Sequence, residues 1–165
     1  MTETTTIDPR LLRDACGRFA TGVTVITTRS GAGDFGMTAN AFMSVSLDPP
    51  LIAVSLGRKA RMLAEIRAAR RYAVNVLAGD MEPVAMHFAG RHDPALASVL
   101  GEEDGLPVLA GAAAVFHTDV VQEIEAGDHV LFIGHVRRIA QDADAPPLLF
   151  HAGRFGLLAP PRRAA

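Results

Sequence analysis

The sequence predicts a mainly β protein, an antiparallel barrel with flanking helices, rather than a doubly wound parallel sheet. Runs of β-forming residues follow one another, and the helical segments interrupt them instead of alternating with them. Two pairs of runs are joined by the short turn sequences SGAGD and EAGD, which favour antiparallel hairpins. No G-x-G-x-x-G follows a predicted strand, so a Rossmann nucleotide site is disfavoured.

A helix is expected at the N-terminus. Asp8 suits the N-cap and Pro9 the first helical position, and apolar residues recur at i, i+4 spacing. We expect this helix to end near Gly22 and Cys16 to be a core thiol.

The remaining elements follow from periodicity and turn residues. We expect strands at 23–29, 51–57 and 71–77, a helix within 58–70, a short helix at 81–90, a loop with at most one short helix at 91–110, a long hairpin within 112–139, and one or two strands within 147–158. Residues 158–165 are expected to form a loose tail.

Length and charge limit the functional classes. The chain of 165 residues is expected to form one domain, residues 1–165. The net charge of −2 gives no electrostatic footprint for nucleic acid or anionic membrane, so neither partner is expected. The single cysteine cannot form an internal disulfide and no long apolar run is present, so a cytoplasmic location is expected. The spacing of the histidines predicts no metal site.

Residues 36–50, GMTANAFMSVSLDPP, are unusually small and polar for a segment that leads into a core strand. Small residues let backbone N–H groups approach a ligand closely, and the hydroxyls and the Asn40 amide add donors and acceptors. This composition suits a flat polar ring. The alternative is a polar turn followed by a strand with one solvated face.

The sequence SLGRKA comes at the change from the strand at 51–57 to the helix that follows. Backbone N–H groups, a serine hydroxyl and two cations at a helix start favour a bound anion. The alternative is that Arg58 and Lys59 are two solvated surface charges.

Five segments together resemble the flavin reductase-like family, which includes reductase components of two-component flavin-dependent monooxygenases. The segments, in order, are GRFATGVTVITT, GMTANAFMSVSLDPPLIAVSLG, YAVNVL, FAG and GDHVLFIGHV. The resemblance implies a split β-barrel fold, a homodimer, non-covalent binding of FMN or FAD, and hydride transfer from NADH or NADPH to the flavin.

The resemblance also implies roles for particular residues. The isoalloxazine ring would be lined by Thr38, Ala39, Asn40, Ser44, Val45 and Ser46. The flavin phosphate would be held by Ser55, Leu56, Gly57, Arg58 and Lys59. Further flavin contacts would come from Phe88, Ala89, Gly90, Arg91, Arg154 and Phe155. His129 of the GDH motif would be the catalytic contact to the nicotinamide.

Two functions remain open at this point. The first is an NAD(P)H:flavin oxidoreductase that supplies reduced flavin to a separate monooxygenase component. The alternative is a non-catalytic flavin- or haem-binding split-barrel protein. Met81, His117 and Phe155 depart from residues that are common in the family, which leaves the contacts on the substrate side open.

Overall fold

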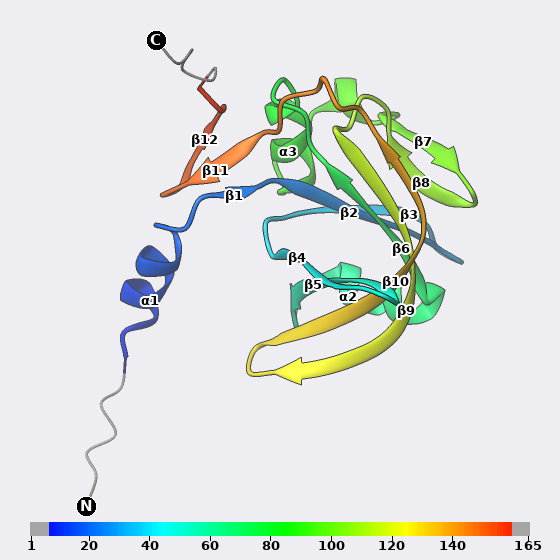
Figure 1. Ribbon diagram of the computed structural model, residues 1–165, viewed down its shortest axis with the longest axis horizontal. Coiled ribbons are helices and arrows are strands. Elements are labelled where there is room, and N and C mark those ends of the chain that lie inside the picture. Colours follow the sequence, from blue (N-terminus) through cyan, green and yellow to red (C-terminus); the bar gives the residue numbers. More distant parts are fainter. Residues whose placement is uncertain (1–6, 160–165) are drawn as a thin grey trace, which may run out of the picture.

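The computed structural model describes residues 7–159, in which strands predominate and three α-helices flank them (Figure 1). The mainly β class with flanking helices is confirmed. The helices are α1 (Pro9–Cys16), α2 (Arg61–Ala69) and α3 (Glu82–Phe88), with a 3-10 turn η1 (Pro94–Leu96). The strands are β1 (Thr21–Gly22), β2 (Thr24–Ser30), β3 (Gly33–Ala39), β4 (Phe42–Leu47), β5 (Pro50–Gly57), β6 (Arg71–Val76), β7 (Leu100–Glu103), β8 (Leu106–Leu109), β9 (Ala114–Ala126), β10 (His129–Gln141), β11 (Leu149–His151) and β12 (Arg154–Gly156).

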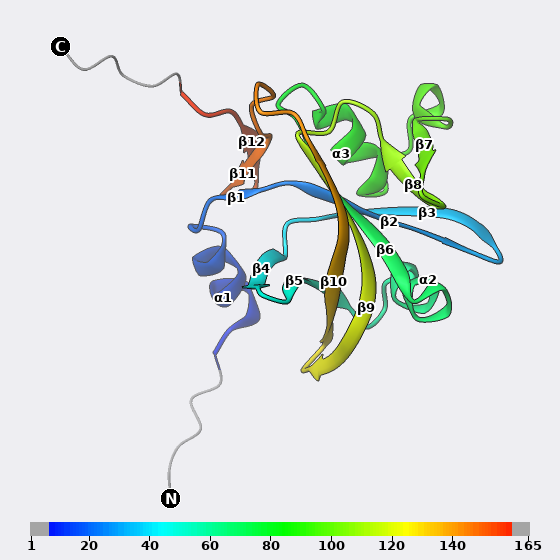
Figure 2. The same cartoon turned by 45° about the vertical axis from the view of Figure 1, so that its right-hand side comes forward.

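A seven-stranded antiparallel sheet in the order β3-β2-β6-β9-β10-β5-β4 forms the body. The sheet curves strongly, and in the view of Figure 2 α3 lies above and α2 below strands β2 and β3, which both helices contact. Among residues 7–159, β3 and β4 end this order and no pairing joins them, so hydrogen bonds do not close the sheet into a full barrel.

Two apolar clusters fill the fold. One joins the inner face of the sheet to α2, where Met62, Leu63 and Ile66 pack with residues such as Leu56 and Phe132. The other lies on the opposite face of the sheet, where α3 and β8 pack. Helices α2 and α3 are therefore each held by the apolar side that faces the sheet.

Helix α1 differs from the expectation in length and in packing. Asp8 caps it as predicted, accepting a hydrogen bond from the Arg10 amide at 2.8 Å. The helix ends at Cys16 because Gly17, a poor helix former, takes the C-cap. No residue of α1 is buried, so the prediction that Cys16 is a core thiol is wrong. Figure 1 shows the reason: α1 lies apart from the sheet and covers none of it.

The segment 91–110 contains a hairpin that the sequence reading missed. The strands β7 and β8 pair antiparallel. They are joined by Asp104 and Gly105, both with positive φ, the left-handed conformation that tight turns require. Every residue of β8 is buried against the core. Of the residues that suggested a loop, the glycines and acids of 101–105 form β7 and the turn, whereas Pro107 lies in the buried strand β8.

The other expected elements are present. The long hairpin of β9 and β10 turns at Gly127 and Asp128, as EAGD predicts. The C-terminal pair, β11 and β12, joins β1 in a small separate sheet. Most of the expected loose tail, residues 160–165, lies outside the described residues. Within residues 7–159, no helix has the length and apolarity needed to cross a membrane.

Candidate functional site

Two cavities meet at Asn40, in the segment between β3 and β4. The first, about 690 Å³, contains two arginines, one carboxylate and two phenylalanines. Its lining residues are Val23, Thr38, Ala39, Asn40, Glu82, Met86, Ala89, Arg91, Phe150, Gly153, Arg154 and Phe155. The second, about 390 Å³, is mostly apolar. Its lining residues are Cys16, Phe19, Thr21, Asn40, Ala41, Phe42, Met43, Ala53, Val54, Ser55 and Leu131.

The predicted ring-binding residues Thr38, Ala39 and Asn40 all face the first cavity. Their backbone is fixed from both sides. The Thr38 hydroxyl donates to the Ala85 carbonyl of α3 at 2.6 Å, and the Thr24 hydroxyl donates to the Ala39 carbonyl at 2.6 Å. The Asn40 carbonyl accepts from the Phe42 amide at 3.0 Å, and Asn40 lines both cavities. Residues 38–40 are thus fixed by hydrogen bonds at the boundary between the two cavities.

The structure does not bring Ser44, Val45 and Ser46 into either cavity. They lie on β4, the last strand of the sheet, where Val45 occupies a β-bulge between Ser44 and Ser46. Val45 is 44% exposed. Their role at the ring stays a prediction.

The predicted phosphate residues and His129 lie side by side. Strands β5 and β10 pair antiparallel, with Ser55 opposite Leu131 and Gly57 opposite His129. A Cβ atom on Gly57 would lie 3.9 Å from His129 Nε2, so this ring nitrogen is directed at Gly57. Ser55 and Leu131 line the second cavity, and Gly57 and His129 lie two residues further along on the same sheet face. Leu56 points the other way, into the core.

The turn that carries His129 is held by charged groups. His129 Nδ1 lies 2.8 Å from Asp128 Oδ1, and this hydrogen bond holds the pKa of Asp128 below its usual range. Arg58 donates from Nε to the Gly127 carbonyl at 2.8 Å and from Nη2 to Glu125 at 3.0 Å. The hydrogen bond from Arg58 lowers the pKa of Glu125.

Lys59 is placed to meet an anion. It precedes α2, whose N-cap residue Ala60 makes no side-chain capping bond and whose first turn contains no acid. The Leu63 amide donates to the Ala60 carbonyl at 3.1 Å, and among the described residues the Arg61 and Met62 amides have no acceptor, so these two can meet an anion. The ion pairs of residues 58–61 are those of Arg58 and Arg61, so within the described chain Lys59 has none.

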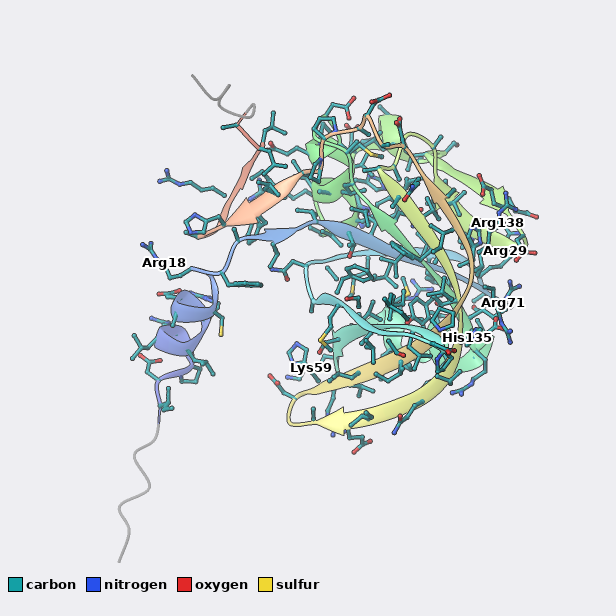
Figure 3. All side chains as sticks on the ribbon, in the orientation of Figure 1. Arg18, Arg29, Lys59, Arg71, His135 and Arg138 are labelled. Atoms are coloured by element: carbon teal, nitrogen blue, oxygen red, sulfur yellow. The ribbon has the colours of Figure 1, made fainter. Side chains whose placement is uncertain are left out.

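Figure 3 shows Lys59 at the end of the curved sheet beside the turn between β9 and β10. The labelled Arg29, Arg71 and Arg138 lie on the other side of the molecule. Each of these arginines pairs with acids of the β3 or β7–β9 region. Lys59, which has no ion-pair partner among the described residues, thus lies at the predicted phosphate site, and the residues present fit a flavin nucleotide.

The FAGR segment is divided between two surfaces. Ala89 and Arg91 line the first cavity. Phe88 and Gly90 line a different depression with Arg61 and His87. Phe88 packs against Gly36 of β3 so closely that a Cβ there would lie 2.4 Å from its ring. Phe88 thereby positions α3, and Gly90, with φ of 99°, turns the chain towards Arg91.

The C-terminal hairpin closes the first cavity. Arg154 and Phe155 of β12 both line it, as predicted. Phe155 meets Phe150 of β11 edge to face, with ring centroids 5.3 Å apart. The arrangement fits one face of a planar ring.

Sequence reasoning missed several lining residues. Glu82, Met86 and Phe150 face the first cavity, and Cys16, Phe19 and Leu131 face the second. Leu131 was recoverable, because it lies two residues after His129 on the same strand face. The others come from elements whose packing the sequence does not specify. The described residues contain no group of three or more His, Cys, Asp or Glu side chains suited to a metal ion.

Known proteins resemble the chain over nearly its whole length. Residues 16–159 match the family model described as flavin reductase like domain. An NADH-dependent flavin reductase of Rhodococcus sp is 45% identical over 164 residues, which cover 94% of this chain and 92% of the relative. An NADH-dependent FAD reductase of Streptomyces globisporus is 40% identical over 164 residues, covering 93% and 90%.

Solved structures agree with the sequence relatives. The flavin reductase PheA2 in its native state superposes with a TM-score of 0.88 at 49% identity, covering 93% of this chain and 100% of the other. The Streptomyces globisporus NADH:FAD oxidoreductase SgcE6 in complex with NAD and FAD fragments gives 0.86 at 38% identity, covering 96% and 99%. By sequence and by fold, the chain belongs to the flavin reductase-like family.

Proposed function

We propose that the protein is an NAD(P)H:flavin oxidoreductase, which transfers a hydride from the nicotinamide to FMN or FAD. The observation that carries the proposal is the pairing of β5 with β10. It sets His129 opposite Gly57, beside the uncapped start of α2 and Lys59. One sheet face therefore offers an anion site and a nicotinamide contact at adjacent positions.

The protein's part in the reaction is alignment. The nicotinamide supplies the hydride and the flavin accepts it, so the enzyme needs no nucleophile of its own. The Asn40 segment and the Phe150–Phe155 pair would orient the flavin, while Lys59 and the α2 amides would neutralise its phosphate. Bringing the two rings to about 3–3.5 Å supplies most of the rate enhancement.

His129 would orient the nicotinamide carboxamide. Ionised Asp128 only accepts hydrogen bonds, so Nδ1 of His129 carries the proton that lies between them. In the neutral ring Nε2 then accepts from the carboxamide –NH₂. The protonated ring would instead donate at Nε2 to the carboxamide oxygen.

Both relatives of known cofactor use described above are named as NADH-dependent, which supports NADH as the donor. FMN and FAD both remain acceptors in the proposal, because FMN reductases and FAD reductases are found among the relatives. Since NADH is a cytoplasmic metabolite, we place the reaction in the cytoplasm.

We further propose that reduced flavin leaves for a separate oxygenase. The reductase component of 4-hydroxyphenylacetate 3-monooxygenase from Thermus thermophilus is 36% identical over 138 residues. The flavin reductase component of a bacterial two-component tryptophan halogenase has a TM-score of 0.85 at 36% identity. These relatives support a component role for this chain.

A homodimer would cover the apolar surface around the second cavity. Phe19 is 78% exposed, Leu47 is 93% exposed, and α1 buries none of its leucines. Such a surface is unusual for a monomer.

We predict that Phe19→Asp shifts the protein from dimer to monomer in light scattering and weakens flavin binding, because Phe19 also lines the cavity. Ile139→Asp, a change at another exposed apolar residue, is the control and should stay dimeric. A monomeric wild type would contradict the proposal.

The test of the proposed function is NADH oxidation at 340 nm by purified protein with FMN, FAD or riboflavin. We expect turnover well above the control without protein. If no flavin supports NADH oxidation, the reductase proposal fails. Flavin binding without turnover would then favour the non-catalytic alternative.

A further inference from the structure

Arg58 makes three hydrogen bonds to residues 125–128, the turn that precedes His129. Its backbone amide donates to the Asp128 carbonyl at 2.9 Å, one residue beyond the last strand pair of β5 and β10. Its side chain then continues over the turn to the Gly127 carbonyl and to Glu125 of β9. The residue that follows β5 thus contacts both the turn and the end of β9.

These contacts lie at the exposed turn of the β9–β10 hairpin. His129 is the first residue of β10, its side chain is 48% exposed, and Gly127 has a φ of 60°. A turn with so little buried surface opens at low free-energy cost unless other contacts hold it. The planar guanidinium is suited to this task because its N–H groups form two charge-assisted or carbonyl hydrogen bonds in a fixed fork.

Because Arg58 bonds to protein acceptors, the neighbouring Lys59 is the cation that can bind the flavin phosphate. Arg58 Nε and Nη2 are directed at protein acceptors, whereas Lys59 pairs with no acid of the described chain. Glu125, held against Arg58, would repel a phosphate bound at the same guanidinium. Charge therefore favours Lys59 over Arg58 as the phosphate contact.

We propose that Arg58 is a positioning residue, which holds the 125–128 turn against β5 so that His129 stays opposite Gly57, and that of these two neighbouring cations Lys59 is the one that contacts the flavin phosphate. The proposal rests on the function proposed above and divides a pair of residues that the family resemblance treats alike.

The test compares Arg58→Ala with the matched control Lys59→Ala, using FMN and riboflavin, which lacks the phosphate. For Arg58→Ala we expect KM for NADH to rise about fivefold with either flavin, as the loss of one or two hydrogen bonds implies. KM for FMN should stay unchanged. For Lys59→Ala we expect KM for FMN to rise, KM for riboflavin to stay unchanged, and KM for NADH to stay unchanged.

A third variant, Glu125→Gln, distinguishes the two possible roles of Arg58, because each role predicts a change in a different KM. If Arg58 braces the turn, loss of the Glu125 charge weakens the brace and raises KM for NADH in the same direction as Arg58→Ala. If Arg58 binds the phosphate, loss of that charge frees the guanidinium and lowers KM for FMN. The second result, or a rise in KM for FMN but not riboflavin in Arg58→Ala, overturns the proposal.

Amide hydrogen exchange gives a reading that does not need activity. Arg58→Ala should speed exchange at residues 126–130, and Lys59→Ala should not. An inactive wild type would defeat the proposed function, while unchanged exchange in Arg58→Ala would defeat the brace itself. The two failures are therefore distinguishable.

Discussion

At the scale of single residues, the candidate site depends on a few polar atoms whose partners are fixed by the backbone. His129 Nε2 faces Gly57, a residue without a side chain, and its Nδ1 is engaged by Asp128. A larger side chain at position 57 would fill the space in front of the imidazole. Glycine there keeps the ring accessible to a second ligand.

We predict that His129→Ala raises KM for NADH about fivefold and leaves KM for the flavin unchanged, because one neutral hydrogen bond to the carboxamide is lost. Steady-state kinetics with varied NADH and varied FMN check this. His92→Ala, a change at an exposed histidine away from both cavities, is the control. An unchanged KM for NADH in His129→Ala would remove the nicotinamide assignment.

At the scale of elements, α3 is docked on β3 by two close contacts. The Phe88 ring lies over Gly36, and the Thr38 hydroxyl bonds to the Ala85 carbonyl. These contacts set the position of Ala89 and Arg91, which follow α3 and line the first cavity. The site thus depends on a helix–strand contact that lies outside it.

We predict that Gly36→Ala displaces α3, since the new Cβ would lie 2.4 Å from the Phe88 ring. Overpacking of this kind costs about 1–3 kcal/mol of unfolding free energy. Urea unfolding and flavin titration should show lower stability and weaker binding together. Adding Phe88→Ala to Gly36→Ala should cost less than the sum of the two single changes.

Gly31→Ala is the control for this experiment, because a Cβ there meets no atom within 4 Å. It should leave both stability and flavin binding unchanged. Full flavin affinity and unchanged stability in Gly36→Ala would contradict the docking argument.

At the scale of the whole molecule, the β7–β8 hairpin covers a buried titratable group. The His117 side chain on β9 is fully buried, and neither ring nitrogen has a hydrogen-bond partner in the described residues. Its nearest acid is Glu103 of β7, at 3.7 Å. Burial lowers the pKa of His117 below its ordinary value of 6.5, and the Glu103 charge opposes this shift only in part.

We predict that His117 makes the protein less stable as the pH falls below about 6.5. The folded-state pKa lies below the unfolded-state pKa, so the unfolded chain binds more protons in that range and the unfolding free energy decreases. Urea unfolding between pH 8 and pH 5 should show a shallower pH slope for His117→Gln than for the wild type. Equal slopes for the two proteins would contradict this prediction.

Much of the fold was predictable because its signals are local. The Asp8 cap, the EAGD turn and the β-branched run at residues 24–28 of β2 fix their own elements, whatever lies elsewhere in the chain. The family resemblance named most of the residues at the first cavity. It did not separate those facing the cavity from Phe88 and Gly90, which face elsewhere, because a motif does not give side-chain direction.

By itself, the sequence determined that this is a mainly β protein of the flavin reductase-like kind, and it predicted an anion site at residues 55–59. Only the tertiary structure decided which distant residues meet. The pairing of β5 with β10 put His129 opposite Gly57, and it joined Arg58 to Gly127 and Glu125, 67 to 69 residues further along the chain. Strand register depends on the packing of the whole sheet, and no local pattern specifies it.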